Sequence, residues 1–214
     1  VLTAKPTLTF ITTPNNPTGS VVKISEIVEL AKATASIGGL LVVDEAYAEF
    51  SSEISAVTLI AQYPNVIVIR TMSKAFAFAG ARLGYLIADP AVIDALQLVR
   101  LPYHLSAITQ AVAEVALSFS DELLAGVDTL IAQREIVQAG LSKLGLNITP
   151  SAANFLLFGG FNQPADQLWQ KLLDRGILIR DVGLLGQLRV TIGTAAENQA
   201  FLSALTEVLA EGDK

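Results

Sequence analysis

Four polar side chains in this chain follow apolar stretches of the kind that form buried strands. Lys74 comes shortly after Val66–Ile69, and the polar residues that follow comparable stretches are Asn16, Asp44 and Tyr47. Ligands of open α/β sheets bind outside the carboxyl ends of the strands, so residues at these places carry more weight than residues within strands. A lysine amine held there can act as a nucleophile toward a carbonyl group. The spacing therefore predicts a site where amine and carbonyl chemistry takes place.

A cofactor that is held as a Schiff base would use this set of side chains. Such a cofactor needs one amine for the covalent bond, an anion facing its ring nitrogen, and hydrogen-bond donors at its phenolic oxygen. Lys74, Asp44 and the pair Asn16 and Tyr47 offer these three kinds of group. We therefore expect a pyridoxal 5'-phosphate site.

Each of these features, taken singly, also has an ordinary structural explanation. Asp44 could cap a helix that follows a strand. Lys74 could be a solvated surface lysine, and Pro14–Gly19 (PNNPTG) could be a plain turn, because Asn, Pro and Gly dominate turns. The prediction of a cofactor site therefore depends on the combination.

The elements that must position these residues alternate between short apolar runs and a helical run in the first ninety residues. This alternation predicts a doubly wound α/β sheet. A helix with Ser25 as its N-cap, running through Ser36, would complete a βαβ crossover between the first two strands. The predicted strands are Thr7–Thr13, Gly39–Val43, Val66–Arg70 and Gly84–Ala88.

The pattern becomes mostly helical after Asp89-Pro90, with a long periodic stretch from about Ser106 to Leu144. The later residues predict a small α+β layer with strands at Asn154–Phe158, Ile177–Arg180 and Leu188–Ile192, and helices at Ala165–Arg175 and Glu197–Glu211. We expect a cofactor-binding portion of a large domain at residues 1–95. A small C-terminal domain, which includes a long connecting helix, would follow at residues 96–214.

The composition excludes several classes of partner. The net charge of -6, without a cluster of Lys and Arg, argues against nucleic acid and anionic membranes. No apolar run approaches the roughly 18 residues of a membrane span. The absence of cysteine suits the cytoplasm, and the single histidine, His104, cannot assemble a zinc site.

The chain is unusually apolar for its length of 214 residues. Hydrophobic residues make up 52% of it and charged residues 16%, against roughly 45–50% and about 25% in an average soluble domain. Such an excess is expected of a piece whose apolar surfaces face partners. The first residue is Val1 rather than methionine, and we expect a cut there.

Four segments, taken in order, resemble the aspartate-aminotransferase fold family of pyridoxal-phosphate enzymes. They are PNNPTG at 14–19, VVDEAYAEF at 42–50, TMSKAFAFAGARLGY at 71–85 and LRVTIGT at 188–194. The resemblance implies the C-terminal part of a large domain, with a mostly parallel sheet and helices on both faces, followed by a smaller α+β domain. It also implies a homodimer that transfers an amino group between an amino substrate and a 2-oxo acid.

The same resemblance assigns roles around the cofactor. Lys74 would form the covalent bond, and Asp44 would keep the ring nitrogen protonated, which makes the ring a better acceptor of electrons. Asn16 and Tyr47 would hydrogen-bond the phenolic oxygen. The phosphate ligands would be Ser73 and Arg82, with Arg82 as a planar, charge-assisted clamp.

The substrate groups implied by the resemblance lie in the last third of the chain. Arg189 matches the arginine that binds the substrate anion, and Asn154 resembles a residue that orients the substrate. Arg180 gives a second cation if its strand neighbours that of Arg189, and two arginines suit a phosphate better than one carboxylate requires. This pairing is similar to the subgroup of histidinol-phosphate aminotransferases, which implies L-histidinol phosphate and 2-oxoglutarate as substrates in histidine biosynthesis.

Two kinds of alternative remain open at this point. Within enzymes, another class I or II aminotransferase or a phosphothreonine-type decarboxylase shares the fold. Outside enzymes, the chain could be a non-catalytic fragment that acts only in folding or dimerisation. The resemblance has one main departure, because family members begin well before Val1 with an N-terminal arm and a cofactor-phosphate loop at a helix N-terminus.

Overall fold

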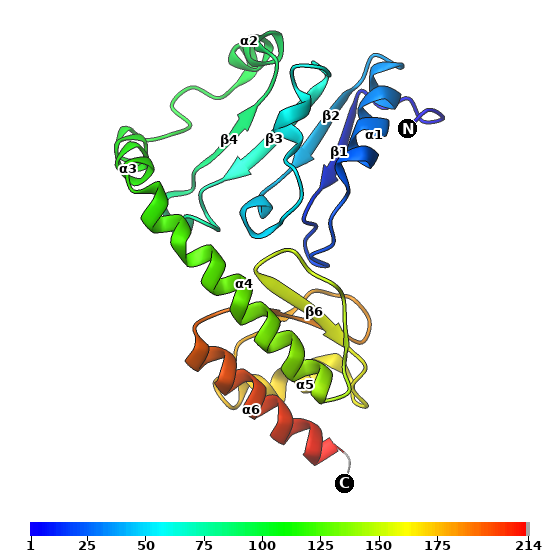
Figure 1. Cartoon of the computed structure of the whole chain (residues 1–214), viewed down its shortest axis with the longest axis vertical. Helices are drawn as coiled ribbons and strands as arrows, with labels where there is room; N and C mark the ends of the chain where they lie inside the picture. The colour runs from blue at the N-terminus through cyan, green and yellow to red at the C-terminus, as the bar shows by residue number, and fades with distance from the viewer. Residues whose placement is uncertain (213–214) are drawn as a thin grey trace. The chain divides into compact units, whose positions relative to one another are not determined.

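The computed structural model describes residues 1–212, which form two compact units. The first unit comprises Val1–Pro14 and Val21–Gly126, and the second comprises Asn15–Ser20 and the residues from Val127 onward. The chain therefore passes from one unit to the other after Pro14, after Ser20 and after Gly126 (Figure 1). The short segment Asn15–Ser20 belongs to the second unit although the residues on both sides of it belong to the first.

The first unit contains a four-stranded sheet in the order β1-β2-β3-β4. The strands are β1 (Leu8–Thr12), β2 (Leu40–Asp44), β3 (Val66–Thr71) and β4 (Gly84–Ile87). The first three pair in parallel, and β4 is antiparallel to β3. All four predicted strands are confirmed to within two residues at each end. The parallel pairing brings the ends of β1, β2 and β3 to one edge of the sheet.

Helix α1 (Ile24–Ala35) connects β1 to β2 and packs its apolar side on the sheet. Ile27 and Ala31 are buried there against Val43 and Val68. The prediction that Ser25 is the N-cap is wrong, because the cap is Lys23. The Glu26 carboxylate accepts a hydrogen bond from the Lys23 backbone N–H at 2.9 Å. This bond satisfies a backbone N–H that has no partner within the helix, and it lets the helix begin two residues earlier than predicted. Three short 3-10 helices complete the loops: η1 (Ala48–Phe50), η2 (Ala56–Leu59) and η3 (Ala79–Ala81).

The predicted helical stretch from Ser106 to Leu144 is two helices. α3 (Ala107–Ser118) ends at Phe119, where the backbone leaves the helical region, and α4 (Ser120–Lys143) begins directly afterwards. The Ser118 hydroxyl donates to the Val115 carbonyl, so it competes with the helical hydrogen bonds at this point. The preceding helix, α2 (Pro90–Val99), has Asp89 as its N-cap, and the Asp89 carboxylate accepts a hydrogen bond from the Ala91 N–H at 2.9 Å.

Large apolar side chains are exposed in the first unit. Leu98 of α2 is 87% exposed and Tyr103 is 99% exposed, while Phe10 of β1 is 66% exposed. These side chains account for part of the high hydrophobic content of the chain. No helix within residues 1–212 combines the length and low polarity that a membrane span requires.

The second unit contains an antiparallel sheet in the order β5-β6-β8-β7. The strands are β5 (Asn147–Ile148), β6 (Phe155–Gly159), β7 (Arg180–Asp181) and β8 (Gln187–Thr191). The strand predicted at Ile177–Arg180 is wrong for its first three residues. The Ile179 carbonyl accepts the indole N–H of Trp169 at 2.9 Å, so this backbone group is not used in a ladder.

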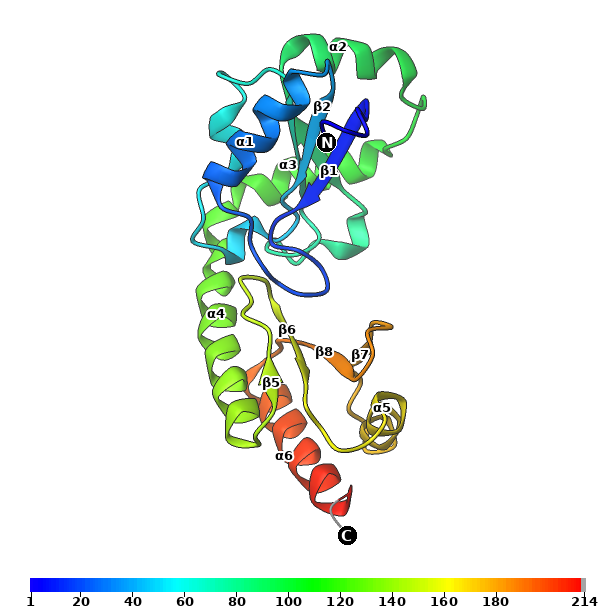
Figure 2. The ribbon, with the colours of Figure 1, turned by 90° about the vertical axis from the view of Figure 1, so that its right-hand side faces the viewer.

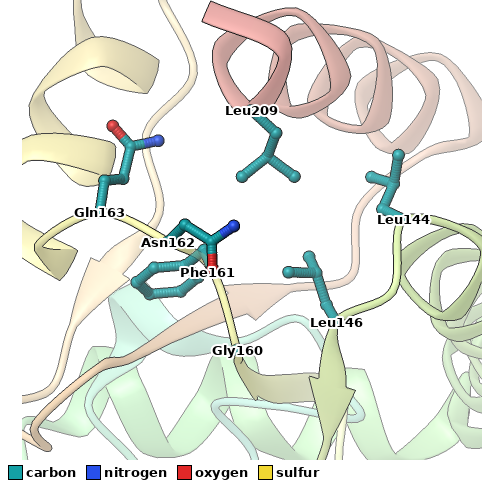
Figure 3. A pocket seen from close by; sticks show the side chains of 7 residues that line it. All are labelled: Leu144, Leu146, Gly160, Phe161, Asn162, Gln163 and Leu209. Atoms are coloured by element: carbon teal, nitrogen blue, oxygen red, sulfur yellow. The ribbon is translucent and has the colours of Figure 1, made fainter. Parts of the chain in front are cut away.

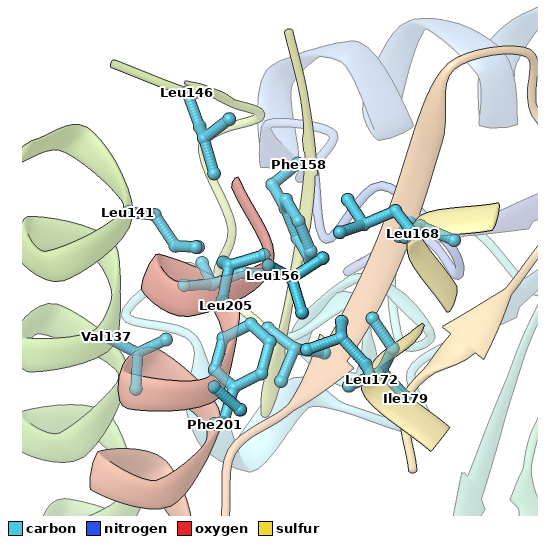
Figure 4. Packing of buried hydrophobic residues seen from close by; sticks show 14 of the residues in the cluster. Val137, Leu141, Leu146, Leu156, Phe158, Leu168, Leu172, Ile179, Phe201 and Leu205 are labelled. Carbon is cyan, nitrogen blue, oxygen red and sulfur yellow. The ribbon is translucent and has the colours of Figure 1, made fainter. Parts of the chain in front are cut away.

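Helices α4, α5 (Ala165–Leu173) and α6 (Ala195–Gly212) pack with this sheet around one apolar core. Figure 4 shows Phe158 and Leu156 of β6 meeting Phe201 and Leu205 of α6 in its centre. α4 and α6 lie side by side in the second unit (Figure 2), and Gly140 permits their close approach. A Cβ atom at Gly140 would lie 2.7 Å from a methyl carbon of Leu202.

A capping box at the start of α6 gives a pH-dependent contribution to stability. The Glu197 carboxylate accepts hydrogen bonds from the Thr194 N–H and hydroxyl, each at 2.7 Å, and the backbone bond is the main cause that lowers the pKa of Glu197 below 4.5. Because the folded pKa is the lower one, this stabilisation is present above pH 4.5 and is lost as the pH falls through the folded pKa. We expect Glu197→Gln to unfold at lower urea at pH 7 and to lose less stability than the parent between pH 5 and 3. Glu114→Gln, which removes an exposed carboxylate from the body of α3, is the control and should leave this pH dependence unchanged.

Candidate active site

One cavity of the first unit brings several of the candidate residues together. It has a volume of about 400 Å³ and opens at the carboxyl ends of β2 and β3. Asp44, Ser73, Lys74 and Arg82 line it, together with residues at the end of β3, which include Arg70, and at the start of β4. Small-molecule sites commonly measure about 300–1,000 Å³, so the cavity is large enough for a substituted aromatic ring.

Asp44 is held firmly at the end of β2. Its backbone carbonyl accepts the Thr13 N–H at 2.9 Å, and its carboxylate accepts the Ala46 N–H at 3.0 Å. The side chain is half-buried. The bond to Ala46 uses one lone pair of one carboxylate oxygen, so the carboxylate keeps the capacity to face a cationic or protonated group of a ligand.

Lys74 lies beside the ring of Tyr47. The Lys74 Nζ atom is 5.5 Å from the ring centroid, within the range of a cation–π interaction, and the Tyr47 side chain is buried. Ala75 and Phe76, which follow the lysine, are buried and anchor the loop, while the lysine itself is exposed. The first unit therefore presents the amine at a surface rather than in an apolar interior.

Ser73 and Arg82 lie at the two ends of the loop between β3 and β4. The Ser73 N–H donates to the Thr71 hydroxyl at 3.1 Å, and the Arg82 guanidinium donates to the Ala79 carbonyl at 3.1 Å. Arg82 has a φ of +55° and Ala77 a φ of +52°, a left-handed conformation that costs energy for a residue with a Cβ. The hydroxyl and the guanidinium on one cavity suit the oxygens of a phosphate.

A buried ion network, which the sequence reasoning missed, lies next to Asp44. The Arg70 guanidinium is 2.7 Å from the Glu45 carboxylate and 2.9 Å from the Glu49 carboxylate. Burial alone would lower the pKa of Arg70, but the two carboxylates together raise it. Two features of the sequence could have indicated this network. One is a charged residue, Arg70, inside the otherwise apolar strand 66–71, and the other is the pair of glutamates four residues apart in DEAYAEF.

In the second unit, Asn16 is joined to Arg189. The Asn16 side-chain oxygen accepts a hydrogen bond of 2.6 Å from the Arg189 guanidinium. The loop that carries Asn16 is attached to the unit by a backbone bond from the Ala152 N–H to the Gly19 carbonyl, at 2.8 Å. Because the guanidinium can only donate, it selects the orientation of the amide, and the Asn16 NH₂ group is left to donate elsewhere.

Arg180 and Arg189 are direct partners across the β7–β8 pair. Directly opposed residues of antiparallel strands place their side chains on the same face, and like charges in this position are destabilising. The guanidinium of Arg189 also lies 4.7 Å from the centre of the Phe155 ring. Two cations on one face of an edge pair form a place where an anion with two or more charges would relieve the repulsion.

Asn154 is not part of either cluster. The Asn154 carbonyl accepts the Ile192 N–H at 2.9 Å, and the preceding Ala153 carbonyl accepts the Arg134 guanidinium at 2.8 Å. The β6–β8 register pairs Arg189 with Leu157, which is three residues away from Asn154. The role of Asn154 in orienting a substrate therefore stays a prediction, as do the roles of the other candidates.

A separate pocket of the second unit contains none of the candidate residues. It lies where α6, the end of α4 and the segment after β6 meet (Figure 3), and its lining includes Leu144, Leu209 and Gln163. No lining residue carries a charge. We assign it no role in the chemistry.

The fold and these clusters of side chains describe an α/β protein with a lysine at the strand ends of its sheet. A mostly parallel sheet with a lysine cavity at its strand ends is followed by an α+β unit with paired arginines. The family model described as aminotransferase class I and II matches residues 2–205. The chain belongs to this family.

Curated and solved relatives agree with the family. The histidinol-phosphate aminotransferase of Mycolicibacterium smegmatis is 58% identical over 205 residues, which are 95% of this chain and 53% of that protein. The chain thus spans about half the length of the curated relatives it matches. The crystal structure of histidinol-phosphate aminotransferase from Sinorhizobium meliloti in complex with pyridoxal-5'-phosphate is 31% identical, with a TM-score of 0.86, covering 98% of this chain and 60% of that one. L-Threonine-O-3-phosphate decarboxylase from Porphyromonas gingivalis, at 24% identity and a TM-score of 0.85 over 95% of this chain and 64% of that one, shares the fold.

The close contact between Gly19 and Ser151 gives a test of how the Asn16 loop is held. Gly19 has a φ of +76°, and a Cβ atom there would lie 2.0 Å from the Ser151 hydroxyl oxygen. We expect Gly19→Ala to lower the free energy of unfolding by more than about 1 kcal/mol, because it adds a clash to backbone strain. Gly145→Ala is the matched control, since Gly145 has a φ of +75° and a Cβ atom there would meet no other atom within 4 Å. Urea unfolding of both variants measures the difference, and equal losses would show that Ser151 does not hold the loop.

Proposed function

We propose that this chain carries the lysine, the cofactor contacts and the substrate-anion site of a pyridoxal-phosphate-dependent aminotransferase. The proposed reaction converts L-histidinol phosphate and 2-oxoglutarate to imidazole acetol phosphate and L-glutamate. The observation that carries the proposal is the arrangement of Lys74, Asp44, Ser73 and Arg82 around one cavity at the strand ends.

The groups present fit the chemistry of pyridoxal 5'-phosphate. The cavity offers one primary amine, one carboxylate, and a hydroxyl with a guanidinium, which match an aldehyde, a ring nitrogen and a phosphate. When it is bound, this cofactor withdraws electrons from the α-carbon of the amino substrate. We propose that Lys74, Asp44, Ser73 and Arg82 hold it, and that Tyr47 and Asn16 donate to its phenolic oxygen.

The proposed roles of these side chains follow from their charges. The Asp44 carboxylate favours a proton at the ring nitrogen, since a nearby anion stabilises the cationic form. The Lys74 amine takes the proton from the substrate α-carbon, as a positioned general base. Ser73 and Arg82 hold the phosphate and thereby keep the ring from turning while the proton moves.

The substrate class is proposed from the paired arginines. A phosphate monoester carries close to two negative charges at neutral pH, and Arg180 and Arg189 supply two positive ones. The similarity to histidinol-phosphate aminotransferases supports a phosphate as the distal group of the amino substrate. Arg189 would also receive a carboxylate of glutamate in the other half of the reaction.

Three further proposals concern the setting of the site. Residues 1–95 would be the cofactor-binding portion, and residues 96–214 the small domain with its connecting helix. A homodimer is proposed from the family resemblance. A cytoplasmic location is proposed because a chain without cysteine suits a reducing compartment, and because the resemblance described above implies an enzyme of histidine biosynthesis.

Lys74 is expected to be the single point of covalent attachment for the cofactor. After incubation with pyridoxal phosphate and reduction with borohydride, the parent chain should gain one cofactor mass, and Lys74→Ala should gain none. Lys32→Ala is the control, since Lys32 is exposed on α1 in an ion pair with Glu29, and it should label like the parent. Intact-mass spectrometry with peptide mapping gives the readout.

Two results would contradict the assignment. Labelling of another lysine would assign the covalent attachment to that lysine, and no labelling of the parent chain would favour the non-catalytic fragment.

In a single turnover with L-histidinol phosphate, formation of pyridoxamine phosphate is expected. Release of carbon dioxide with phosphothreonine instead would favour the decarboxylase reaction.

Removal of Arg180 is expected to change the substrate preference. Arg180→Gln should weaken the binding of L-histidinol phosphate by about 10–100-fold, because a charged hydrogen bond contributes about 1.5–3 kcal/mol. Binding of L-glutamate should change less, since one carboxylate is served by Arg189. Calorimetric dissociation constants for both ligands measure the ratio, with Arg175→Gln as a control outside the arginine pair. An equal loss for both ligands would contradict a phosphate-specific role.

A further inference from the structure

Arg70 connects the segment after β2 with the end of β3. Its guanidinium pairs with Glu45 at 2.7 Å and with Glu49 at 2.9 Å, and it also donates to the Ser55 hydroxyl at 3.0 Å. The side chains of Glu45, Glu49 and Arg70 are only 3%, 15% and 17% exposed. Three charges are therefore held together with little access of water.

Glu45 is itself anchored on the other side. Its carboxylate accepts the Ala56 N–H at 2.6 Å and the Ser55 hydroxyl at 2.7 Å. The backbone N–H of Glu45 donates to the Ile69 carbonyl at 2.9 Å. The residue directly after Asp44 is thus attached to β3, to the start of η2 and to Arg70 at the same time.

The three members of this network lie close in sequence to three of the residues proposed above to contact the cofactor. Glu45 follows Asp44 directly, Glu49 lies two residues after Tyr47, and Arg70 lies four residues before Lys74. The planar fork of one arginine therefore spans the segment that carries the carboxylate and the phenol, and joins it to the strand that leads to the amine. A shift of either carboxylate would move the residues next to it.

Stability alone does not explain such a network. Replacing a complete buried ion pair by apolar residues is often neutral or stabilising, so the pair is weak evidence for a stabilising role. The network also has a cost, because the Arg70 Nε and Glu49 Oε2 atoms are buried without a hydrogen-bond partner among residues 1–212. What the network supplies is a defined geometry, since a guanidinium fork binds carboxylates in fixed directions.

We propose that Arg70 is a positioning residue whose fork, through Glu45 and Glu49, sets the separation of Asp44 and Lys74, which line the cavity, and of Tyr47, whose ring lies beside the Lys74 amine. Arg70 is also one of the residues that line the cavity. The role proposed for it is to position Asp44, Tyr47 and Lys74 through Glu45 and Glu49, and not to act on the reacting atoms. The cofactor part of the test rests on the proposed function above, whereas the backbone part does not.

The experiment separates charge balance from geometry with three variants of the full chain. Arg70→Met leaves two buried carboxylates without a cationic partner and tests the whole network. Arg70→Met combined with Glu45→Gln and Glu49→Gln removes all three charges, so that no buried charge is left uncompensated. Arg70→Lys keeps the charge and lacks the planar fork.

The matched control is a second arginine that bridges two glutamates. Arg175 pairs with Glu207 and Glu211, which are also four residues apart but lie at the surface of the second unit. The triple variant Arg175→Met, Glu207→Gln and Glu211→Gln removes the same groups far from the cavity residues in sequence. It should leave both readouts described next unchanged.

The first readout is amide hydrogen exchange without cofactor, and the second is the dissociation constant for pyridoxal phosphate together with its absorption spectrum when bound. We expect the neutral triple variant of Arg70 to keep the urea midpoint of the parent chain. Its amide exchange at residues 44–50 should be faster than in the parent by about tenfold or more, and its affinity for pyridoxal phosphate should be weaker by about tenfold or more. Exchange in β1 should stay at the parent's rate. Arg70→Lys should resemble the neutral variant in exchange and in spectrum.

Parent-like exchange and cofactor affinity in the neutral triple variant would overturn the proposal, because the network would then only balance its own charges. If Arg70→Met does not fold, the neutral variant and Arg70→Lys still give both readouts. If no variant, including the parent, binds the cofactor, the proposed function fails, while the exchange at residues 44–50 still decides the role of Arg70.

Discussion

The candidate site depends on the way in which one guanidinium holds two carboxylates behind the end of β2. A strand end is normally a flexible place, because the ladder of hydrogen bonds stops there. Here Glu45 is tied to Arg70, Ser55 and Ala56, and the Asp44 carbonyl is tied to Thr13. Burial makes each of these bonds stronger and makes the loss of any partner costly. The Asp44 side chain can therefore face a cavity without losing its position.

The second constraint is the attachment of the Asn15–Ser20 loop to the second unit. Its sequence neighbours belong to the first unit, yet Asn16 accepts a hydrogen bond from Arg189, and Gly19 lies so close to Ser151 that a Cβ atom would not fit between them. A residue expected to contact the cofactor thus shares a hydrogen bond with a residue expected to bind the substrate anion. An anion that attracts Arg189 acts on the same guanidinium that orients the Asn16 amide, so the two functions are physically connected within this unit.

Local patterns predicted most of the fold. The four strands of the first sheet follow from apolar, β-branched runs that end in polar residues, and α1 follows from the spacing of Ile27 and Ala31. The errors occurred where a side chain overrides the local pattern. Trp169 takes the carbonyl of Ile179, Ser118 competes with the helical bonds before Phe119, and Glu26 moves the start of α1.

The sequence by itself determined which residue types stand at the strand ends, and therefore that an amine, a carboxylate and phosphate-binding groups are available. Only the tertiary structure decided that Arg180 and Arg189 are opposite each other, that Arg70 bridges Glu45 and Glu49, and that the Asn16 loop joins the second unit. The periodicity of a strand or helix depends on neighbouring residues and can be recognised in a short window. Strand register, buried ion pairs and loop attachment join residues far apart in the chain, and they are selected by the packing of the whole unit.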